Sequence, residues 1–359
     1  MNCNLCNHNN LELVYSIENI PIFQNKVFTT KSKARETLTG NVFIVQCCNC
    51  GFIFNSDFNN SIMNYNEEYQ NEQSNSAYFR DYLDGIVTLL IDYGFKNKKI
   101  IEIGCGKGYF LEKLTKTGFD ATGFDPAYEG SNSNIVKDYF SKKYSDLNAD
   151  LIILRHTLEH IQNPKSFLLN IARANNNYGK IFIEVPTLEW ILDKAAFWDI
   201  FYEHVNYFTQ YSLGNMFVDS FQGLLFHKQY QFIIAELSKL NISNIPLNKE
   251  QSIDFSCFTR SIDYYKMYVK QKNALAIWGA GAKGTAFLNM LDPNREFVKC
   301  VIDINPKKQN KYIAKTGHLI VKPSELDCYK IENILVMNEN YLNEIHQIVN
   351  NDAIKIECL

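Results

Sequence analysis

The stretch KKIIEIGCGKGYFLEKL, residues 98–114, decides the fold of this chain. A short apolar run comes first, glycines follow at Gly104, Gly106 and Gly108, and a run with helical spacing comes after them. Glycine is needed where the backbone turns sharply and approaches a ligand closely. The stretch therefore predicts a buried strand, a tight turn and a helix.

The residues that follow repeat this alternation of strand and helix. Apolar runs of strand length lie at 120–125, 149–156 and 179–186, and segments of helical length lie at 108–118 and 163–176. Such alternation predicts a parallel, doubly wound sheet. Two more runs, 223–231 and 232–237, are close enough in sequence to form a hairpin, which would give the sheet an antiparallel end.

Two C-x-x-C pairs mark the beginning of the chain. Cys3 and Cys6 form the first pair, and Cys47 and Cys50 form the second. Four thiolates in two tight turns are the ligands of a closed, structural zinc site, with Zn–S distances of ~2.3 Å. Cys48 is a rival ligand, and the alternatives are free buried cysteines or a ribbon that binds nucleic acid.

The chain divides into three predicted domains. Residues 1–80 are polar and carry the cysteine pairs, so we expect a small zinc-binding domain that depends on its metal. Residues 81–250 hold the doubly wound sheet, which predicts a Rossmann-like domain. A polar stretch at 241–253 reads as a linker, and residues 251–359 predict a helix followed by a second Rossmann-like α/β unit. The fold class is therefore α/β.

Composition excludes several classes of function. The chain has 359 residues, 46% of them hydrophobic and 21% charged, with a net charge of −3. No apolar run approaches the ~20 residues of a membrane span, and no positive field favours nucleic acid or a membrane as a partner. The start shows no secretory signal. We expect a cytoplasmic protein that acts on a small molecule, and the sequence leaves its oligomeric state open.

Acidic residues near the first glycine loop point to a nucleoside. Glu102 precedes the loop and Asp125 ends the next strand, where a carboxylate can accept hydrogen bonds from both hydroxyls of a ribose. Asp138 is placed to receive an adenine amine. With its G-x-G-x-G spacing and its hairpin, the pattern resembles the class I methyltransferases that use S-adenosylmethionine (SAM). A nicotinamide dehydrogenase is the alternative.

The stretch HTLEH, residues 156–160, matches the H-x-x-E-H signature of a class of zinc proteases. It directly follows a predicted strand, at the point where methyltransferases of this class line the cofactor pocket. We therefore expect His156, and with it Glu159, to face the cofactor. His160 is equally consistent with a core or capping histidine.

The stretch FYEHVNYFT, residues 201–209, raises the question of proton chemistry. It follows the strand at 181–186, whose carboxyl end opens toward the ligand crevice in a doubly wound sheet. An imidazole titrates near pH 6.5, which suits His204 to the role of general base, with Glu203 or a tyrosine to orient it. The alternative is a structural histidine that caps a loop.

A paired-cysteine N-terminus, a central SAM domain, a Glu-His loop and a C-terminal WGAGAKG stretch occur here in the order seen in three-domain sugar C-methyltransferases. The chain resembles that family over essentially its full length. The resemblance implies a nucleotide-linked 4-keto sugar as acceptor and His204 as the base, with Glu203 beside it. The family's tyrosine two positions before the glutamate is here Phe201, and Tyr202 is adjacent.

The same resemblance implies that the N-terminal domain lends a tyrosine to the active site. That residue would fall within 65–74, with Tyr69 as the first candidate and Tyr65 as the second. The alternative for this segment is a solvated polar helix. A SAM-dependent O- or N-methyltransferase acting on a sugar or another small molecule is the second prediction for the function.

A second glycine loop lies at 274–284, with Asp303 at the end of the next strand. This is a Rossmann pattern, in which a helix N-terminus receives a phosphate. The resemblance implies that the loop holds the nucleotide of the acceptor, with a lysine near its phosphates. The alternatives are a turn without a ligand and an NAD-dependent oxidoreductase. The predicted substrate-binding residues are Gly279, Gly281, Lys283 and Gly284.

Overall fold

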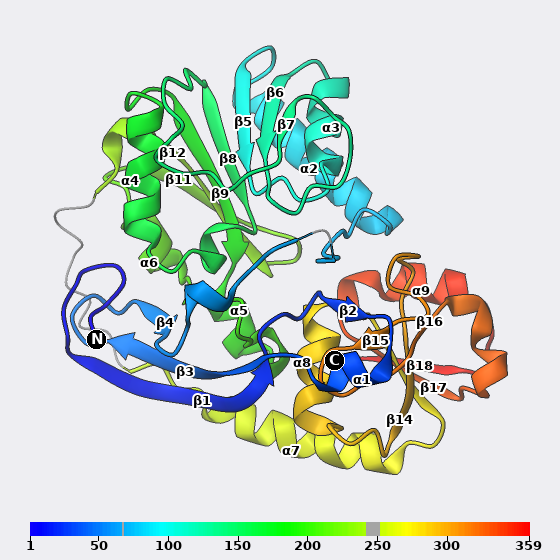
Figure 1. Cartoon of the computed structure of the whole chain (residues 1–359). Helices are drawn as coiled ribbons and strands as arrows, with labels where there is room; N and C mark the ends of the chain where they lie inside the picture. The colour runs from blue at the N-terminus through cyan, green and yellow to red at the C-terminus, as the bar shows by residue number, and fades with distance from the viewer. Residues whose placement is uncertain (67, 242–251) are drawn as a thin grey trace.

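The computed structural model describes residues 1–66, 68–241 and 252–359. Most of the predicted linker at 241–253, and with it the predicted boundary at residue 250, falls outside the described residues. Three sheets and one short two-stranded ribbon organise the described chain. In Figure 1 the largest sheet lies above the other two.

The largest sheet has seven strands in the order β11-β12-β9-β8-β5-β6-β7. Its strands are β5 (Lys99–Ile103), β6 (Asp120–Phe124), β7 (Ile135–Val136), β8 (Leu151–Arg155), β9 (Lys180–Pro186), β11 (Ser220–Leu225) and β12 (Tyr230–Glu236). Strands β5 to β9 run parallel, while β12 is antiparallel to both β9 and β11. The predicted Rossmann-like doubly wound sheet with a hairpin at its antiparallel end is confirmed, but the hairpin turn falls inside the predicted run 223–231, between Leu225 and Tyr230.

Helices cover both faces of this sheet, as a parallel sheet requires. They are α2 (Ala77–Asp92), α3 (Tyr109–Lys116) and α4 (Pro164–Ala174). Leu83 of α2 and Leu111 of α3 share one core with Ile100 of β5, whereas Leu168 of α4 packs with Ile101 in a second core. Consecutive residues of β5 therefore point into opposite cores, which explains why this strand reads as a continuous apolar run.

The N-terminal unit is built on an antiparallel sheet in the order β1-β3-β4-β10. Its elements are β1 (Leu11–Pro21), α1 (Lys31–Arg35), β3 (Thr39–Cys47), β4 (Ile53–Asn55) and β10 (Asn206–Tyr207). The last strand comes from a distant part of the chain, because Asn206 pairs with Phe54. The segment that follows His204 therefore completes the N-terminal sheet.

The C-terminal unit has a five-stranded parallel sheet in the order β16-β14-β13-β17-β18. Its elements are α7 (Ser256–Gln271), β13 (Leu275–Trp278), α8 (Ala282–Leu291), β14 (Val298–Ile302), β16 (Ile320–Val321), β17 (Asn333–Val336), α9 (Leu342–Val349) and β18 (Lys355–Cys358). Phe287 of α8 and Phe258 of α7 pack with Ile277, while Ile345 of α9 packs with Ala276. Alternate residues of β13 thus face the helices on opposite sides of the sheet.

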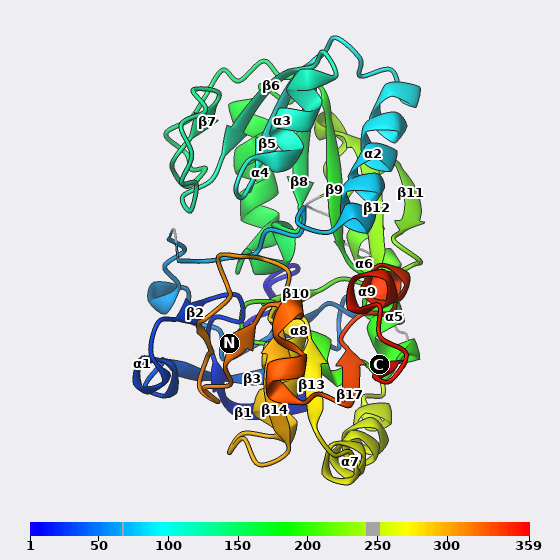
Figure 2. The same ribbon diagram turned by 90° about the vertical axis from the view of Figure 1, so that its right-hand side faces the viewer.

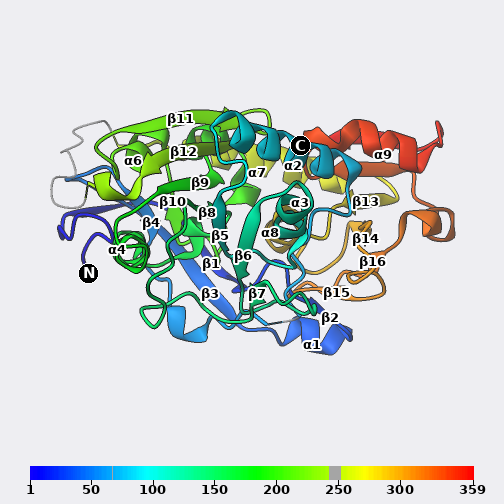
Figure 3. The same ribbon diagram turned by 90° about the horizontal axis from the view of Figure 1, so that it is seen from above.

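The N-terminal and C-terminal units share one core. Ile22 and Ile44 of the first unit, Phe197 of the central chain and Phe287 of the last unit belong to the same buried cluster. A ribbon of β2 (Val27–Phe28) and β15 (Tyr312–Ile313) adds a second link. Figure 2 shows the two smaller units together below the large sheet, and Figure 3, seen from above, shows β13 and β14 of the C-terminal unit to the right of β5, β6 and β7.

Short elements fill the connections. They are α5 (Leu188–Asp193), α6 (Gln210–Gly214) and single 3-10 turns at Asn60–Ile62, Leu158–His160, Phe197–Asp199, Leu237–Lys239, Pro323–Glu325, Asp327–Tyr329 and Glu339–Tyr341. Among the described residues, we find no helix with the length and hydropathy that a bilayer crossing requires.

Candidate functional site

A cavity of about 290 Å³ lies where the three units meet. Asn25 and Tyr69 of the N-terminal unit line it, as do His204 of the central chain and both Gly281 and Lys308 of the C-terminal unit. The large sheet opens toward this cavity through the residues that follow β8 and β9. Residues that the sequence associates with separate motifs therefore share one space.

The first glycine loop makes close contacts that only glycine allows. Gly104 has φ +81°, and a Cβ there would lie 2.2 Å from the Thr157 hydroxyl oxygen. Gly108 has φ +86°, and its Cβ would lie 2.6 Å from Ile135. At Gly106 the nearest atom to such a Cβ is the side-chain oxygen of Asn71 at 3.9 Å, so space remains open there. The loop therefore offers a free edge at Gly106, beside a residue that lines the cavity.

The two acids near this loop, the half-buried Asp125 and the buried Glu102, behave differently. Asp125 accepts hydrogen bonds from the backbone N–H of Gly106 at 2.8 Å and of Ala127 at 2.7 Å, one to each carboxylate oxygen. Glu102 is 2% exposed, and among the described residues one of its oxygens has no hydrogen-bond partner. Burial raises the pKa of Glu102 to about 8. Asp125 thus shapes the loop, while Glu102 keeps an unused acceptor.

Asp138 lies away from the cavity lining. Its carboxylate accepts a hydrogen bond from the Tyr144 hydroxyl at 2.6 Å and forms an ion pair with Lys143. These contacts hold the carboxylate on the segment after β7. The backbone N–H groups of Asp125 and Asp138 both donate to the Val136 carbonyl, so Asp138 lies near Asp125, and neither residue is among those that line the cavity.

The turn after β8 delivers three side chains to the cavity: His156, Glu159 and His160. Burial lowers the pKa of His156, but Glu184 at 3.2 Å, together with Glu159, outweighs that effect and raises the pKa to about 9. His156 is therefore a half-buried cation between two carboxylates. For His160 burial dominates and lowers the pKa.

His204 lies in the same cavity, its ring 4.0 Å from that of Phe201 and 4.9 Å from that of His160. Burial lowers its pKa well below the ordinary value, and the nearby His160, His156 and Lys283 lower it further. The imidazole is therefore neutral at neutral pH. A neutral ring has the free lone pair that a base needs.

Glu203 is fully buried beside His204 and lines the cavity. One of its oxygens accepts a hydrogen bond from the backbone N–H of Gln24 at 3.1 Å. Burial raises the pKa of Glu203 to about 8, although the Gln24 N–H and the Tyr69 side chain lower it in part. At neutral pH the carboxyl group is therefore largely protonated and can donate a hydrogen bond.

In the predicted segment 65–74, the described residues (65–66 and 68–74) form no helix. Tyr69 is 7% exposed, and its hydroxyl accepts a hydrogen bond from Asn25 at 3.4 Å. The Tyr65 hydroxyl lies 3.2 Å from Nδ1 of His160. The solvated polar helix is therefore wrong, because both rings pack into the interface between the N-terminal unit and the large sheet.

Tyr202 does not face the cavity. Its ring packs against Phe58, and its hydroxyl accepts a hydrogen bond from the backbone N–H of Asn59 at 2.9 Å. Tyr202 and Glu203 lie in a turn, which directs Glu203 to the cavity and Tyr202 into the buried cluster shared with the N-terminal unit. Tyr202 therefore leaves the set of candidate catalytic residues.

The second glycine loop repeats the geometry of the first. Gly279 has φ +117°, and a Cβ on Gly284 would lie 2.0 Å from the Gly279 carbonyl oxygen. Asp303 accepts hydrogen bonds from the backbone N–H of Ala280 and Asn305, each at 2.8 Å. This is the same arrangement that Asp125 makes with its own loop.

Two lysines lie at this loop, but they differ in what they contact. Lys283 forms an ion pair with Asp199 at 2.9 Å and lies 4.6 Å from the centre of the Trp190 ring. Lys308 is 5% exposed and donates a hydrogen bond to the Ala280 carbonyl at 3.0 Å. Burial lowers the pKa of Lys308. Both ammonium groups border the cavity, and only Lys308 has no carboxylate at ion-pair distance among the described residues.

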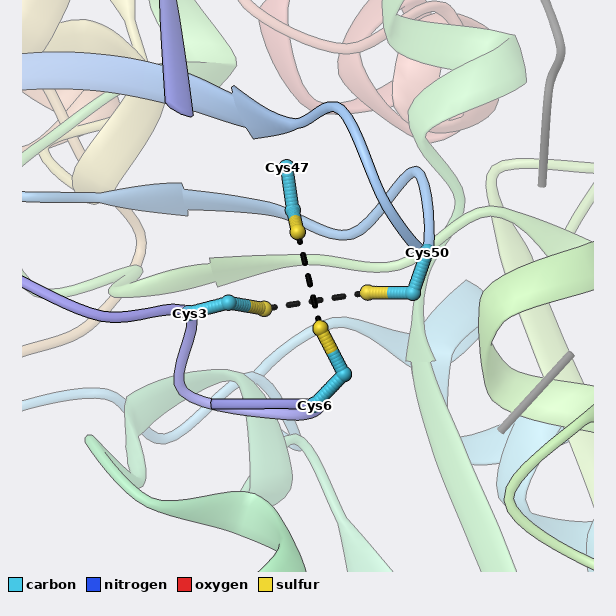
Figure 4. Close-up of side chains that lie close together, drawn as sticks. All are labelled: Cys3, Cys6, Cys47 and Cys50. Carbon is cyan, nitrogen blue, oxygen red and sulfur yellow. Dashed lines mark hydrogen bonds between the residues drawn. The ribbon is translucent and has the colours of Figure 1, made fainter. Parts of the chain in front are cut away.

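The four predicted zinc ligands meet at one point (Figure 4). The sulfur atoms of Cys3 and Cys50 are 3.7 Å apart, and those of Cys6 and Cys47 are 3.5 Å apart. Tetrahedral zinc with Zn–S bonds of ~2.3 Å places its sulfurs at about this separation. Cys48 is exposed and lies outside the cluster. The donor set therefore fits a structural zinc ion.

Several cavity residues could not be found from the sequence. Asn71, Glu72 and Gln73 line the cavity beside the first glycine loop, and Lys308 lines it beside the second. None belongs to a motif, and their positions depend on how the three units pack. The one available signal was the Asn-Glu-Gln run that begins two residues after the predicted Tyr69.

Comparison with known families assigns the central part of the chain. Residues 74–220 match the family described as "Methyltransferase domain". Residues 271–357 match the family described as "C2185-like, N-terminal". The predicted SAM-dependent methyltransferase class is thereby confirmed for the central domain.

Curated relatives resemble only part of the chain. The ubiquinone biosynthesis O-methyltransferase of Rickettsia bellii is 29% identical over 87 residues, which cover 21% of this chain and 36% of that protein. The protein of the same name from Pectobacterium atrosepticum is 26% identical over 103 residues, which cover 25% of this chain and 43% of that protein. The chain thus spans less than half the length of these relatives.

Solved structures of similar fold include two methyltransferases. A SAM dependent methyltransferase from Archaeoglobus fulgidus is 18% identical, covers 45% of this chain and 100% of its own, and has a TM-score of 0.35. One from Aquifex aeolicus is 15% identical, covers 45% of this chain and 94% of its own, and has a TM-score of 0.34.

Proposed function

We propose that the whole protein is a SAM-dependent methyltransferase that transfers a methyl group to a carbon of a nucleotide-linked keto sugar. The observation that carries this proposal is the single cavity that His204, Tyr69 and the second glycine loop share. A cavity bordered by three units suits an acceptor with two chemically different parts, a reacting sugar and a nucleotide. In this proposal the units are the three predicted domains, at 1–80, 81–250 and 251–359.

The first glycine loop is the proposed SAM site. The open edge at Gly106, the unused oxygen of Glu102 and the remaining lone pairs of Asp125 fit the hydroxyls of a nucleoside. His156 lines the cavity, and so does Asn71, which lies beside Gly106. When bound, SAM supplies an electrophilic methyl group. Asp138 is the proposed acceptor for the adenine amine. Tyr144 and Lys143 already contact its carboxylate, which leaves fewer lone pairs for the adenine.

His204 is the proposed general base. It would take the proton from the carbon next to the ketone, the electron pair of the broken C–H bond would form a C=C bond, and the π pair of the C=O bond would move onto the ketone oxygen. The low pKa of His204 keeps the ring neutral and ready to accept. Phe201, whose ring lies 4.0 Å away, restricts the orientation of the imidazole.

Glu203 and Tyr69 are the proposed donors to the developing oxyanion. Both line the cavity, and both are buried. Burial raises the pKa of the Glu203 carboxyl and of the Tyr69 hydroxyl, so each keeps its proton at neutral pH. Preorganised donors of this kind stabilise charge that develops in a transition state. Here Glu203 and Tyr69 take the role of the family's tyrosine, at whose position this chain has Phe201, with Tyr202 adjacent.

The C-terminal loop is the proposed site for the nucleotide. The N-terminus of α8 begins at the loop, and a helix N-terminus attracts phosphate. Gly281 and Gly284 belong to this loop, and Lys283 and Lys308 border it. Lys283 is paired with the Asp199 carboxylate, whereas Lys308 donates a hydrogen bond to the Ala280 carbonyl.

The four-cysteine site is the proposed zinc site, and its role is to hold the N-terminal sheet.

An O-methyltransferase is the second candidate, because the curated relatives carry that name. Transfer to oxygen needs only the deprotonation of a hydroxyl. Deuterium at the carbon beside the acceptor's ketone separates the two reactions. Loss of the label to solvent requires removal of that proton, whereas retention of the label in a methylated product favours transfer to oxygen or nitrogen.

The test of the proposed function is a product assay. The purified, zinc-loaded protein is incubated with SAM and a panel of nucleotide-linked keto sugars, and each mixture is analysed by mass spectrometry. We expect one sugar to gain the mass of one CH₂ group. If no panel member gains it while a non-sugar hydroxyl compound does, the sugar proposal is contradicted.

A further inference from the structure

A buried carboxylate in the cavity is short of partners. Glu159 is 1% exposed, and among the described residues neither of its carboxylate oxygens has a hydrogen-bond partner. The nearest cation is His156, with Nδ1 at 3.6 Å, but that ring also lies 3.2 Å from Glu184. Burying a charge without full compensation is costly. Glu159 therefore has capacity for a further positive charge.

Two imidazoles converge on the same point. One ligand atom each of Glu159, His160 and His204 lie within 4.8 Å of one another. All three residues line the cavity. Two histidines and one carboxylate form a donor set that binds zinc and related divalent ions at ~2.0–2.2 Å, with further coordination positions left open.

The surroundings of the histidines suit them to this role. Nδ1 of His160 lies 3.2 Å from the Tyr65 hydroxyl. A ligating histidine commonly uses its other ring nitrogen in such an outer contact, which fixes the ring. In the part of the chain that the structure describes, the side chain of His204 makes no hydrogen bond, so its lone pair is unclaimed.

We propose that Glu159, His160 and His204 form a second metal site that takes a divalent transition-metal ion, separate from the four cysteines. The ion uses the lone pair with which His204 would accept a proton. A bound ion therefore blocks proton removal in the cavity. The binding site stands independently of the proposed function, and only the blocking effect rests on it.

Metal binding is tested first, without any assay of activity. The full-length protein, with the four-cysteine site filled by Zn²⁺, is titrated with Co²⁺, and the visible absorbance of bound Co²⁺ is recorded. We expect one additional equivalent per chain. Glu159→Gln and His160→Asn should each raise the Co²⁺ dissociation constant at least tenfold, whereas Glu236→Gln, on the exposed end of β12, should leave it unchanged.

The outcomes decide the proposal. No additional equivalent in the wild-type protein overturns it, and so does an equivalent that persists in Glu159→Gln and His160→Asn. Melting curves of each variant establish that it is folded, and His204→Asn provides a third variant should one of the others fail to fold. Tyr65→Phe, which removes the outer contact of His160, should weaken Co²⁺ binding by about tenfold.

The blocking effect is tested separately. Zn²⁺ is added to the wild-type protein in steps, and methyl transfer is measured at each occupancy of the second site. We expect transfer to fall in proportion to occupancy and to return when a chelator removes the second ion. A rise in transfer with occupancy overturns the blocking role. Absence of transfer under all conditions contradicts the proposed function, while the Co²⁺ titration still reports on the site.

Discussion

The side chains of the cavity owe their chemistry to burial. Glu203 and His204 are adjacent in sequence, yet burial raises the pKa of the first and lowers the pKa of the second. Desolvation disfavours the charged form of each group, so the acid keeps its proton and the base stays free of one. A donor and an acceptor of protons therefore lie side by side at neutral pH.

Replacement of His204 by Ala tests the proposed base. Because general-base catalysis contributes about 10²–10⁴-fold, we expect kcat to fall by at least 100-fold. The residue lies apart from the first glycine loop, so SAM affinity measured by calorimetry should stay within about twofold. An equal loss of SAM affinity and turnover would show instead that His204 serves the structure.

Replacement of Glu203 by Gln tests the proposed donor through its pH dependence. The pKa of Glu203 is raised to about 8, so the protonated form that donates a hydrogen bond is lost as the pH rises through 8. The wild-type kcat/KM should therefore decline above that pH. Glutamine keeps a donor and does not ionise, so the alkaline decline should disappear from the profile of the variant. A decline that persists unchanged would assign it to another group.

The C-terminal glycine loop holds its helix and strand in close contact, whereas a glycine within α2 has open space around it. In α8, a Cβ on Gly284 would lie 2.0 Å from the Gly279 carbonyl oxygen, which belongs to the rigid turn after β13. In α2, the exposed Gly85 has no atom within 4 Å of its Cβ position. An added methyl group would therefore clash with the backbone at Gly284 of α8 but meet open space at Gly85 of α2.

Gly284→Ala and Gly85→Ala form a matched pair. Overpacking should make Gly284→Ala less stable by about 1–3 kcal/mol. Gly85→Ala should make the protein more stable by about 1 kcal/mol, because alanine is the better helix former. Urea unfolding of both variants checks the pair. Equal effects would mean that the C-terminal loop can relax around the added methyl group.

The three units depend on one another across the whole molecule. Strand β10 begins two residues after His204 and pairs with β4, which follows directly on the second cysteine pair. A metal ion that fixes the cysteine turns would therefore also fix the position of His204 in the cavity, through the pairing of β4 with β10. Glu344 of α9 adds a further link, because its carboxylate accepts a hydrogen bond from the Ala77 N–H at the start of α2.

Loss of the metal tests this coupling. Cys47→Ser, or removal of zinc by a strong chelator, should lower the melting temperature and reduce methyl transfer together, since a structural zinc ion contributes folding free energy. Cys48→Ser is the control, because Cys48 is exposed and outside the cluster. If Cys47→Ser keeps full transfer and stability, the four cysteines do not support the site.

The sequence by itself determined the elements whose patterns are local. The strand–glycine–helix stretches at 98–114 and 274–284 correspond to β5–α3 and β13–α8, because close approach at a tight turn permits only glycine. The two C-x-x-C pairs meet in one cluster, as their spacing predicted. Short strands such as β7 and β16 carry too few residues for a periodic signal.

Only the tertiary structure decided which side chains share the cavity. It turned Tyr202 into the N-terminal core, held Asp138 away from the cavity, and brought Glu159, His160 and His204 within ligand distance of one another. It also placed Lys308 beside the second glycine loop. Local patterns depend on neighbours along the chain, whereas these contacts depend on how the three sheets bury their apolar faces against one another.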